Sequence, residues 1–130
     1  MRAEGEFEVR LEPLEAYAGP GPGAELGRLS IEKHFSGDLQ GGSAGEMLTA
    51  VSAVEGSAAY VAIERFEGLL KGRRGSFVLV HMGVSTGDQR RLVLEIAPDS
   101  GTADLQGIEG AMAIEQTDGR HYYVLEYVLP

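Results

Sequence analysis

Apolar and polar residues alternate with a period of two along most of the chain, a pattern typical of half-buried β-strands. The clearest example is residues 60–82, where two runs rich in β-branched and aromatic residues flank Gly72-Arg73-Arg74-Gly75. A short interruption bounded by glycines predicts an antiparallel hairpin, here with its turn centred on Arg73-Arg74. The pairs that follow from this turn are Leu70 with Phe77, Gly68 with Leu79, Phe66 with His81 and Glu64 with Gly83.

The same alternation divides the side chains of this hairpin between two faces. One face carries Arg65 and Glu67 among aliphatic residues, and we assign it to the outside of the sheet. We assign the other face, which is mainly aromatic and aliphatic, to the interior. Its members are Tyr60, Ala62, Glu64, Phe66, Leu70, Phe77, Leu79 and His81. Glu64 and His81 are then diagonal neighbours on the inner face, within reach of each other.

Six further stretches alternate in the same way or are bounded by turn residues, and each predicts a strand. They are residues 5–14, 26–35, 39–54, 90–97, 105–116 and 120–129. Asp118-Gly119 is the strongest short-range hairpin signal in the chain, and it pairs Thr117 with Arg120. The inner face of that hairpin then holds Met112, Ile114, Gln116, His121, Tyr123, Leu125 and Tyr127.

The strands predicted on either side of Gly37-Asp38 conflict in register. When the alternation of side chains is counted back from the turn at Gly56-Ser57, Met47 lies on the inner face. When the alternation is then continued across the turn at Gly37-Asp38, the apolar residues around Lys33 fall on the outer face. A slip of one residue reconciles the two counts, so we predict a β-bulge within residues 41–45, whose glycines tolerate that geometry. With this bulge, Lys33 points inward.

Eight antiparallel strands connected in sequence would leave two long edges if the sheet stayed open. Closure removes these edges, so we predict an all-β fold, an eight-stranded antiparallel up-and-down barrel. Nineteen glycines and only five prolines in 130 residues fit many strands joined by tight turns. The length fits one domain over residues 1–130. A barrel of this size has room for one small ligand, as in a lipocalin-like cup.

Composition excludes several classes of function. A formal net charge of −9 at pH 7 disfavours nucleic acids and anionic membrane surfaces as partners, because phosphate binding needs clustered Lys and Arg. The absence of cysteine excludes disulfides, thiolate catalysis and cysteine-based metal sites. No signal-peptide core or membrane-spanning run is visible, so we expect a cytoplasmic protein.

Cofactor and metal motifs are also missing from the sequence. No phosphate loop, zinc motif, nucleophile elbow or dinucleotide fingerprint occurs, so we expect no cofactor. Three histidines, His34, His81 and His121, fall on three separate predicted strands, and His34 is predicted to point outward. Since metal ligands must converge and be oriented by neighbouring groups, we expect no metal site.

Several motifs resemble those of a known family. They are Lys33-His-Phe-Ser-Gly-Asp-Leu, Gly45-Glu-Met-Leu, Gly56-Ser-Ala-Ala-Tyr-Val-Ala-Ile-Glu-Arg, Gly72-Arg-Arg-Gly-Ser-Phe-Val-Leu-Val-His, Pro98-Asp-Ser-Gly-Thr and Gly119-Arg-His-Tyr-Tyr. Together they resemble an uncharacterised bacterial domain-of-unknown-function family with the allene oxide cyclase-like barrel. Residues 100–110 also resemble a glycine-rich loop of dirigent proteins and allene oxide cyclases, with Ala103 and Leu105 where Gly and Phe are usual. The resemblance implies a barrel with a central cavity and brings no assigned activity.

The interior of the predicted barrel supplies the candidate site. A few polar groups among apolar residues are what a small-molecule pocket uses to orient its ligand, although inward aromatic residues also serve as plain core packing. The candidate ligand-binding residues are Lys33, Tyr60, Glu64, Phe66, Phe77, His81, Met112, His121, Tyr123 and Tyr127. We therefore predict a protein that binds a small hydrophobic or aromatic molecule.

Three ionisable residues of this set, Lys33, Glu64 and His81, carry a second hypothesis. In an otherwise apolar wall they either pair with one another as a structural ion pair, or they serve chemistry with pKa values shifted toward their neutral forms. In the second case they are candidate catalytic residues, Glu64 first, of a cofactor-free isomerase or cyclase that acts on an unsaturated hydrophobic substrate.

The outer face of the hairpin over residues 60–82 predicts self-association. It forms an apolar stripe that a soluble monomer would rarely leave exposed. The stripe consists of Val61, Ile63, Leu69, Val78, Val80 and Met82. We expect a homo-oligomer, in the first place a dimer. A trimer is the alternative, because the cyclases and dirigent proteins that the chain resembles are trimeric.

Overall fold

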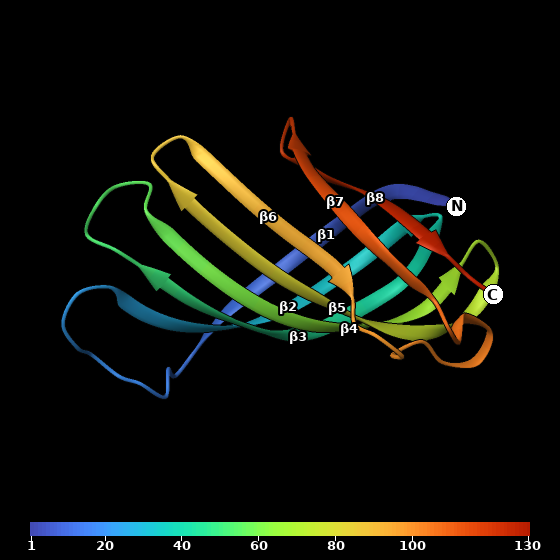
Figure 1. Ribbon diagram of the computed structural model, residues 1–130, viewed down its shortest axis with the longest axis horizontal. Coiled ribbons are helices and arrows are strands. Elements are labelled where there is room, and N and C mark those ends of the chain that lie inside the picture. The colour runs from blue at the N-terminus through green and yellow to red at the C-terminus, as the bar shows by residue number, and fades with distance from the viewer.

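The computed structural model describes residues 1–130 and contains eight antiparallel strands that close into a barrel (Figure 1). The strands are β1 (Arg2–Leu14), β2 (Glu25–Gly37), β3 (Leu39–Val51), β4 (Ala58–Leu70), β5 (Arg73–Thr86), β6 (Gln89–Ile96), β7 (Glu109–Thr117) and β8 (Arg120–Val128). Each strand pairs with the next in sequence, and β8 pairs with β1. The predicted all-β up-and-down barrel is therefore confirmed.

The structure contains no helix with the length and apolarity needed to cross a bilayer.

The barrel has a covered end and an open end. Glu95 and Ala111 form the single residue pair between β6 and β7, and β8 pairs with β1 only from Arg2 to Phe7. Beyond these points β1 to β6 continue as a curved sheet toward the loops that follow β1, β3 and β5 (Figure 1). We call the end bounded by those loops the open end, and the end under the β7–β8 hairpin the covered end.

Apolar side chains fill the covered end. The largest fully buried ones in this core are Tyr123, Phe35, Phe66, Phe77, Leu39, Leu70, Leu79, Leu105, Ile108 and Leu125. Phe35 packs edge-on against Phe66 and Tyr123, with ring centroids 5.6 and 5.4 Å apart. Leu105 belongs to a short 3₁₀ segment, η1 (Ala103–Leu105), which replaces the start of the strand predicted from residue 105. The predicted inner faces of the strands are thus the faces that build the core.

The β4–β5 hairpin turns at Lys71-Gly72, so the predicted turn at Arg73-Arg74 is wrong. Lys71 and Gly72 have φ angles of 47° and 84°. Two consecutive positive φ values are typical of the two-residue turn that matches the twist of hairpin strands, and this turn needs Gly72 inside it. The observed pairs are Leu70 with Arg73, Gly68 with Gly75, Phe66 with Phe77 and Glu64 with Leu79. Each partner lies four positions before the predicted one, and because this number is even, every side chain keeps its predicted face.

The predicted β-bulge in β3 is also wrong. β2 and β3 pair without interruption from Glu25 with Val51 to Phe35 with Gly41. One residue, Asp38, separates the two strands, whereas the predicted conflict assumed a turn of two. With one linking residue instead of two, the inward-facing positions of β2 pair with the inward-facing positions of β3. The apolar residues of both strands therefore face inward together without a slip.

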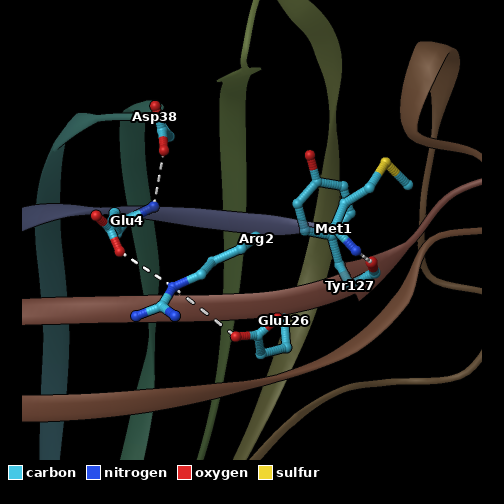
Figure 2. A network of polar contacts seen from close by, with 6 residues as sticks. All are labelled: Met1, Arg2, Glu4, Asp38, Glu126 and Tyr127. Carbon is cyan, nitrogen blue, oxygen red and sulfur yellow. Dashed lines mark hydrogen bonds and ion pairs between the residues drawn. The ribbon is translucent and has the colours of Figure 1, made fainter.

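Contacts with β1 hold this short connection (Figure 2). The Asp38 N–H donates to the Glu4 carbonyl at 3.1 Å, and the Glu4 N–H donates to the Asp38 Oδ2 at 2.9 Å. The Asp38 carbonyl also accepts from the Lys71 N–H at 2.8 Å. The geometry of the β2–β3 connection therefore depends on two segments that are distant in sequence.

The chain start closes the seam between β1 and β8 (Figure 2). The Met1 ammonium donates to the Tyr127 carbonyl at 2.7 Å, and the Tyr127 N–H donates to the Met1 carbonyl at 2.8 Å. On the surface, the Arg2 Nε lies 3.1 Å from the Glu4 carboxylate and 3.9 Å from that of Glu126. These contacts extend the β1–β8 ladder to the first residue.

The glycines assigned to the bulge instead let β3 approach β4 closely. A Cβ atom on Gly45 would collide with the carbonyl oxygen of Ile63. Gly41 and Gly68 pair with each other at φ angles of 150° and 153°, which side chains rarely tolerate. These positions need glycine for close strand contact in a bent sheet.

Candidate functional site

Four polar side chains meet in the middle of the barrel, on the inner faces of β2 to β5. We call Lys33, Ser43, Glu64 and His81 the Glu64 cluster. The Lys33 Nζ donates to the Glu64 Oε2 at 2.9 Å, and the Ser43 Oγ donates to the Glu64 Oε1 at 2.6 Å. Glu64 is 0% exposed, and the other three side chains are buried. Both carboxylate oxygens therefore have partners, one from β2 and one from β3.

His81 completes the cluster from β5. Its Nε2 lies 2.6 Å from the Glu64 Oε2, but the direction of the ring N–H does not fit a hydrogen bond. The two groups are therefore in close contact without a well-directed hydrogen bond. Ala62 pairs with His81 and Glu64 with Leu79, so Glu64 and His81 are diagonal neighbours, as predicted, on the corrected register.

Opposing effects set the pKa of Glu64. Burial by itself raises this pKa, because the charged form loses its water. The contact with His81, the charge of Lys33 and the hydrogen bond from Ser43 together outweigh burial, and they hold the pKa at about 2. Glu64 is therefore ionised at neutral pH and forms a buried ion pair with Lys33.

Tyr60 lies on the open-end side of the Glu64 cluster. Its ring centroid is 6.4 Å from that of His81, and the ring covers Gly83, its partner on β5, so closely that a side chain there would collide with it. Burial, and after it the charge of Glu64, raises the pKa of the Tyr60 hydroxyl. Tyr60 thus borders the polar cluster on one side and the open end on the other.

A recess of about 340 Å³ opens beyond Tyr60, bordered by β3 to β6 and largely by their inner-face residues. Met47, Val51 and Leu92 contribute apolar surface to it, and Leu92 is 43% exposed. The side chains are accessible because the β7–β8 hairpin does not reach this end of the sheet. The recess is therefore apolar surface on the inside of the barrel that the core leaves uncovered.

The predicted ligand-binding residues fall into separate groups. Tyr60 alone among them borders the recess, while Lys33, Glu64 and His81 form the Glu64 cluster. The others lie toward the covered end: Phe66, Phe77, Met112, Tyr123 and Tyr127 are buried in the core, and half-buried His121 packs against Phe7. His34 points outward, and no three potential ligands converge on a metal-binding geometry.

Two parts of this site were not singled out from the sequence. Ser43 fell inside the predicted bulge, where its direction was undefined, although unbroken alternation in β3 would have pointed it inward. Met47 was predicted to face inward, but its exposure and that of Leu92 depend on where the β7–β8 hairpin stops. The point at which one hairpin stops covering another strand leaves no signal in the local sequence pattern.

Comparison with known proteins places the chain in a family. Residues 3–127 match the family described as "Protein of unknown function (DUF3224)". The chain belongs to this family. A crystal structure of a DUF3224 protein of unknown function from Shewanella oneidensis MR-1 is similar over 100% of this chain and 97% of that chain, with a TM-score of 0.96 and 47% sequence identity. No curated protein matches the sequence. The predicted membership of a domain-of-unknown-function family with a barrel fold is confirmed for this DUF3224 protein.

Proposed function

We propose that this DUF3224 protein binds a small hydrophobic or aromatic molecule in the recess at the open end of its barrel. The observation that carries the proposal is about 340 Å³ of space beside uncovered apolar inner-face residues, within the range of about 300 to 1,000 Å³ that is usual for small-molecule sites. Thr49, Tyr60 and Ser85, which carry hydroxyl groups, border the same space. They supply the few polar groups that such a site needs to orient a ligand.

The alternative, a cofactor-free isomerase or cyclase, has less support. A carboxylate with a pKa of about 2 is a poor general base at neutral pH, and both oxygens of Glu64 already have partners. The resemblance of sequence motifs to those of allene oxide cyclases motivates this alternative, but resemblance in fold would not by itself carry a shared activity. Binding is therefore the function that we put first.

Ligands of the recess should raise the melting temperature of the protein. A ligand that binds only the folded state stabilises it, by about 2.7 kcal/mol at a concentration one hundred times its Kd. A thermal-shift screen of fatty alcohols, fatty acids and aromatic metabolites measures this effect. Leu92→Trp should fill the recess and abolish the shifts, whereas Val128→Trp, on the exposed surface of β8, should keep them. A broad screen without any shift would refute the proposal.

We also propose that the protein self-associates through the outer face of β3 to β6, as a dimer with a trimer as the alternative. Leu48 pairs with Val61, Val61 with Met82 and Met82 with Val93, so four exposed apolar side chains form one continuous row across four strands. Ile63 and Val80 extend the row on one side. We take a second copy as the occupant, because a two-fold axis would lay the same apolar row against itself and remove both copies from water.

Ile63→Lys should convert the oligomer to a monomer of 13.9 kDa. Ile63 is 60% exposed, so lysine should be tolerated in the isolated barrel, but a dimer would bury two uncompensated charges. Val128→Lys is the matched control, since Val128 is 58% exposed and lies on β8, outside the row. Light scattering at micromolar concentration measures the mass. A monomeric unmodified protein would contradict self-association.

A further inference from the structure

We propose that the ligand of the recess is a carboxylate with an apolar tail, and that Arg90 holds its carboxylate group. The inference rests on the proposed binding function and names the chemical class of the molecule. The recess differs in charge from the rest of the protein.

The recess is lined by two arginines and by no aspartate or glutamate. The chain as a whole has 20 acidic residues against 11 lysines and arginines, so two neighbouring arginines without an acid in the same lining reverse the overall balance. Neither Arg90 nor Arg91 takes part in any ion pair of the structure. Arg90 shares the inner face of β6 with Leu92, whereas Arg91 pairs with Val84 on the outer face. Arg90 is exposed, so its guanidinium group is accessible to an incoming anion.

Strand register arranges polar and apolar groups in layers from the rim inward. At the rim Arg90 pairs with Ser85, and in the next layer Leu92 pairs with Gly83, which Tyr60 covers. The layer below is that of Met47, which pairs with Ala62. A ligand that enters from the open end therefore meets charge and a hydroxyl first and apolar surface afterwards.

This order fits a molecule with one anionic end. A guanidinium presents parallel N–H donors that match the two oxygens of a carboxylate, and an apolar tail would lie against Leu92 and Met47. Because Arg90 is exposed, water screens its attraction for the carboxylate. We therefore expect the charged contact to contribute selectivity of about tenfold, equivalent to about 1.4 kcal/mol, while burial of the tail provides most of the affinity.

The two arginines also have a simpler explanation. The part of β6 from Gln89 to Leu94 pairs only with β5, and charged residues on a free strand edge prevent association with other chains. This explanation requires positive charge at the edge but no preference for an anion in the recess. The two explanations therefore differ in the ligands that the protein selects.

Decanoate and decanol, which share an alkyl chain and differ in charge, test the inference by isothermal titration calorimetry below their aggregation concentrations. Decanoate should bind about tenfold more tightly than decanol, and added salt should reduce this difference. Arg90→Gln should lower decanoate affinity to that of decanol and leave decanol binding unchanged. Arg91→Gln is the matched control, because it removes the same charge from the next exposed residue of β6, which faces outward.

Each outcome separates the inference from the function on which it rests. Decanoate preference that disappears only in the Arg90 variant supports both. Equal binding of the two molecules, or a preference that the Arg91 variant also removes, overturns the carboxylate inference and leaves the binding function standing. Binding of neither molecule, together with an empty thermal-shift screen, overturns both. Circular dichroism of the free variants confirms that each is folded.

Discussion

Glu64→Gln should destabilise the barrel by about 3 to 5 kcal/mol, the usual effect of removing one partner from a buried ion pair. The amide has nearly the size of the carboxylate and can still accept the hydrogen bond from Ser43. It cannot neutralise the Lys33 ammonium, which would then be a buried charge without a counter-ion. Chemical denaturation monitored by circular dichroism, at neutral pH, measures the loss.

Burial, rather than distance, is the reason for the size of this effect. The Arg28–Glu46 pair is shorter, 2.6 Å against 2.9 Å for Lys33–Glu64, but its side chains are 38% and 55% exposed against 6% and 0%. Water screens the exposed pair and would solvate whichever partner is left. Glu46→Gln, the same chemical change on the adjacent strand, should therefore have a far smaller effect on stability.

The double variant Lys33→Met/Glu64→Gln should recover much of the lost stability, because it removes both charges and leaves no ammonium unpaired. A double-mutant cycle with the two single variants gives the coupling energy. If Glu64→Gln alone kept the full unfolding free energy, the buried ion pair would not hold this part of the barrel together. A loss of ligand binding without a loss of stability would instead make Glu64 a ligand anchor.

Acid should destabilise the protein through the same carboxylate. The pKa of Glu64 is about 2 in the folded chain and near its ordinary 4.5 in the unfolded chain. The unfolded chain therefore takes up a proton first as the pH falls. The contribution of Glu64 is fully present above pH 4.5 and is lost as the pH falls toward 2, and the pKa difference corresponds to about 3 kcal/mol.

Urea denaturation at a series of pH values between 7 and 2 measures this dependence. Glu64→Gln should show a flatter curve over pH 4.5 to 2, because glutamine has no proton to take up. Other carboxylates contribute equally to both proteins, so the difference between the two curves isolates Glu64. Parallel curves would show that Glu64 has the same pKa in the folded and unfolded chains.

Local sequence patterns determined the strands and their faces. The period-two alternation predicted that Glu64 and His81 point inward, whereas the inward direction of Lys33 was predicted through a β-bulge that the structure lacks. The structure buries all three. Asp118-Gly119 predicted its turn and register correctly, because two residues with positive φ and a neighbouring strand pair are enough to define such a hairpin. The diagonal contact of Glu64 with His81 survived an error in the turn, since an even shift moves His81 from one diagonal position to the other.

Tertiary structure alone decided the features that depend on distant segments. Asp38 connects β2 and β3 as a single residue because Glu4 and Lys71 satisfy its backbone and side chain, and neither is a neighbour in sequence. This connection also sets which residues of β3 point inward, and Ser43 is one of them, where it is a partner of Glu64. The recess exists because the β7–β8 hairpin ends before the open end of the sheet. Alternation specifies which side of a strand faces inward, but the length of strand that another element covers is set by how the whole chain closes.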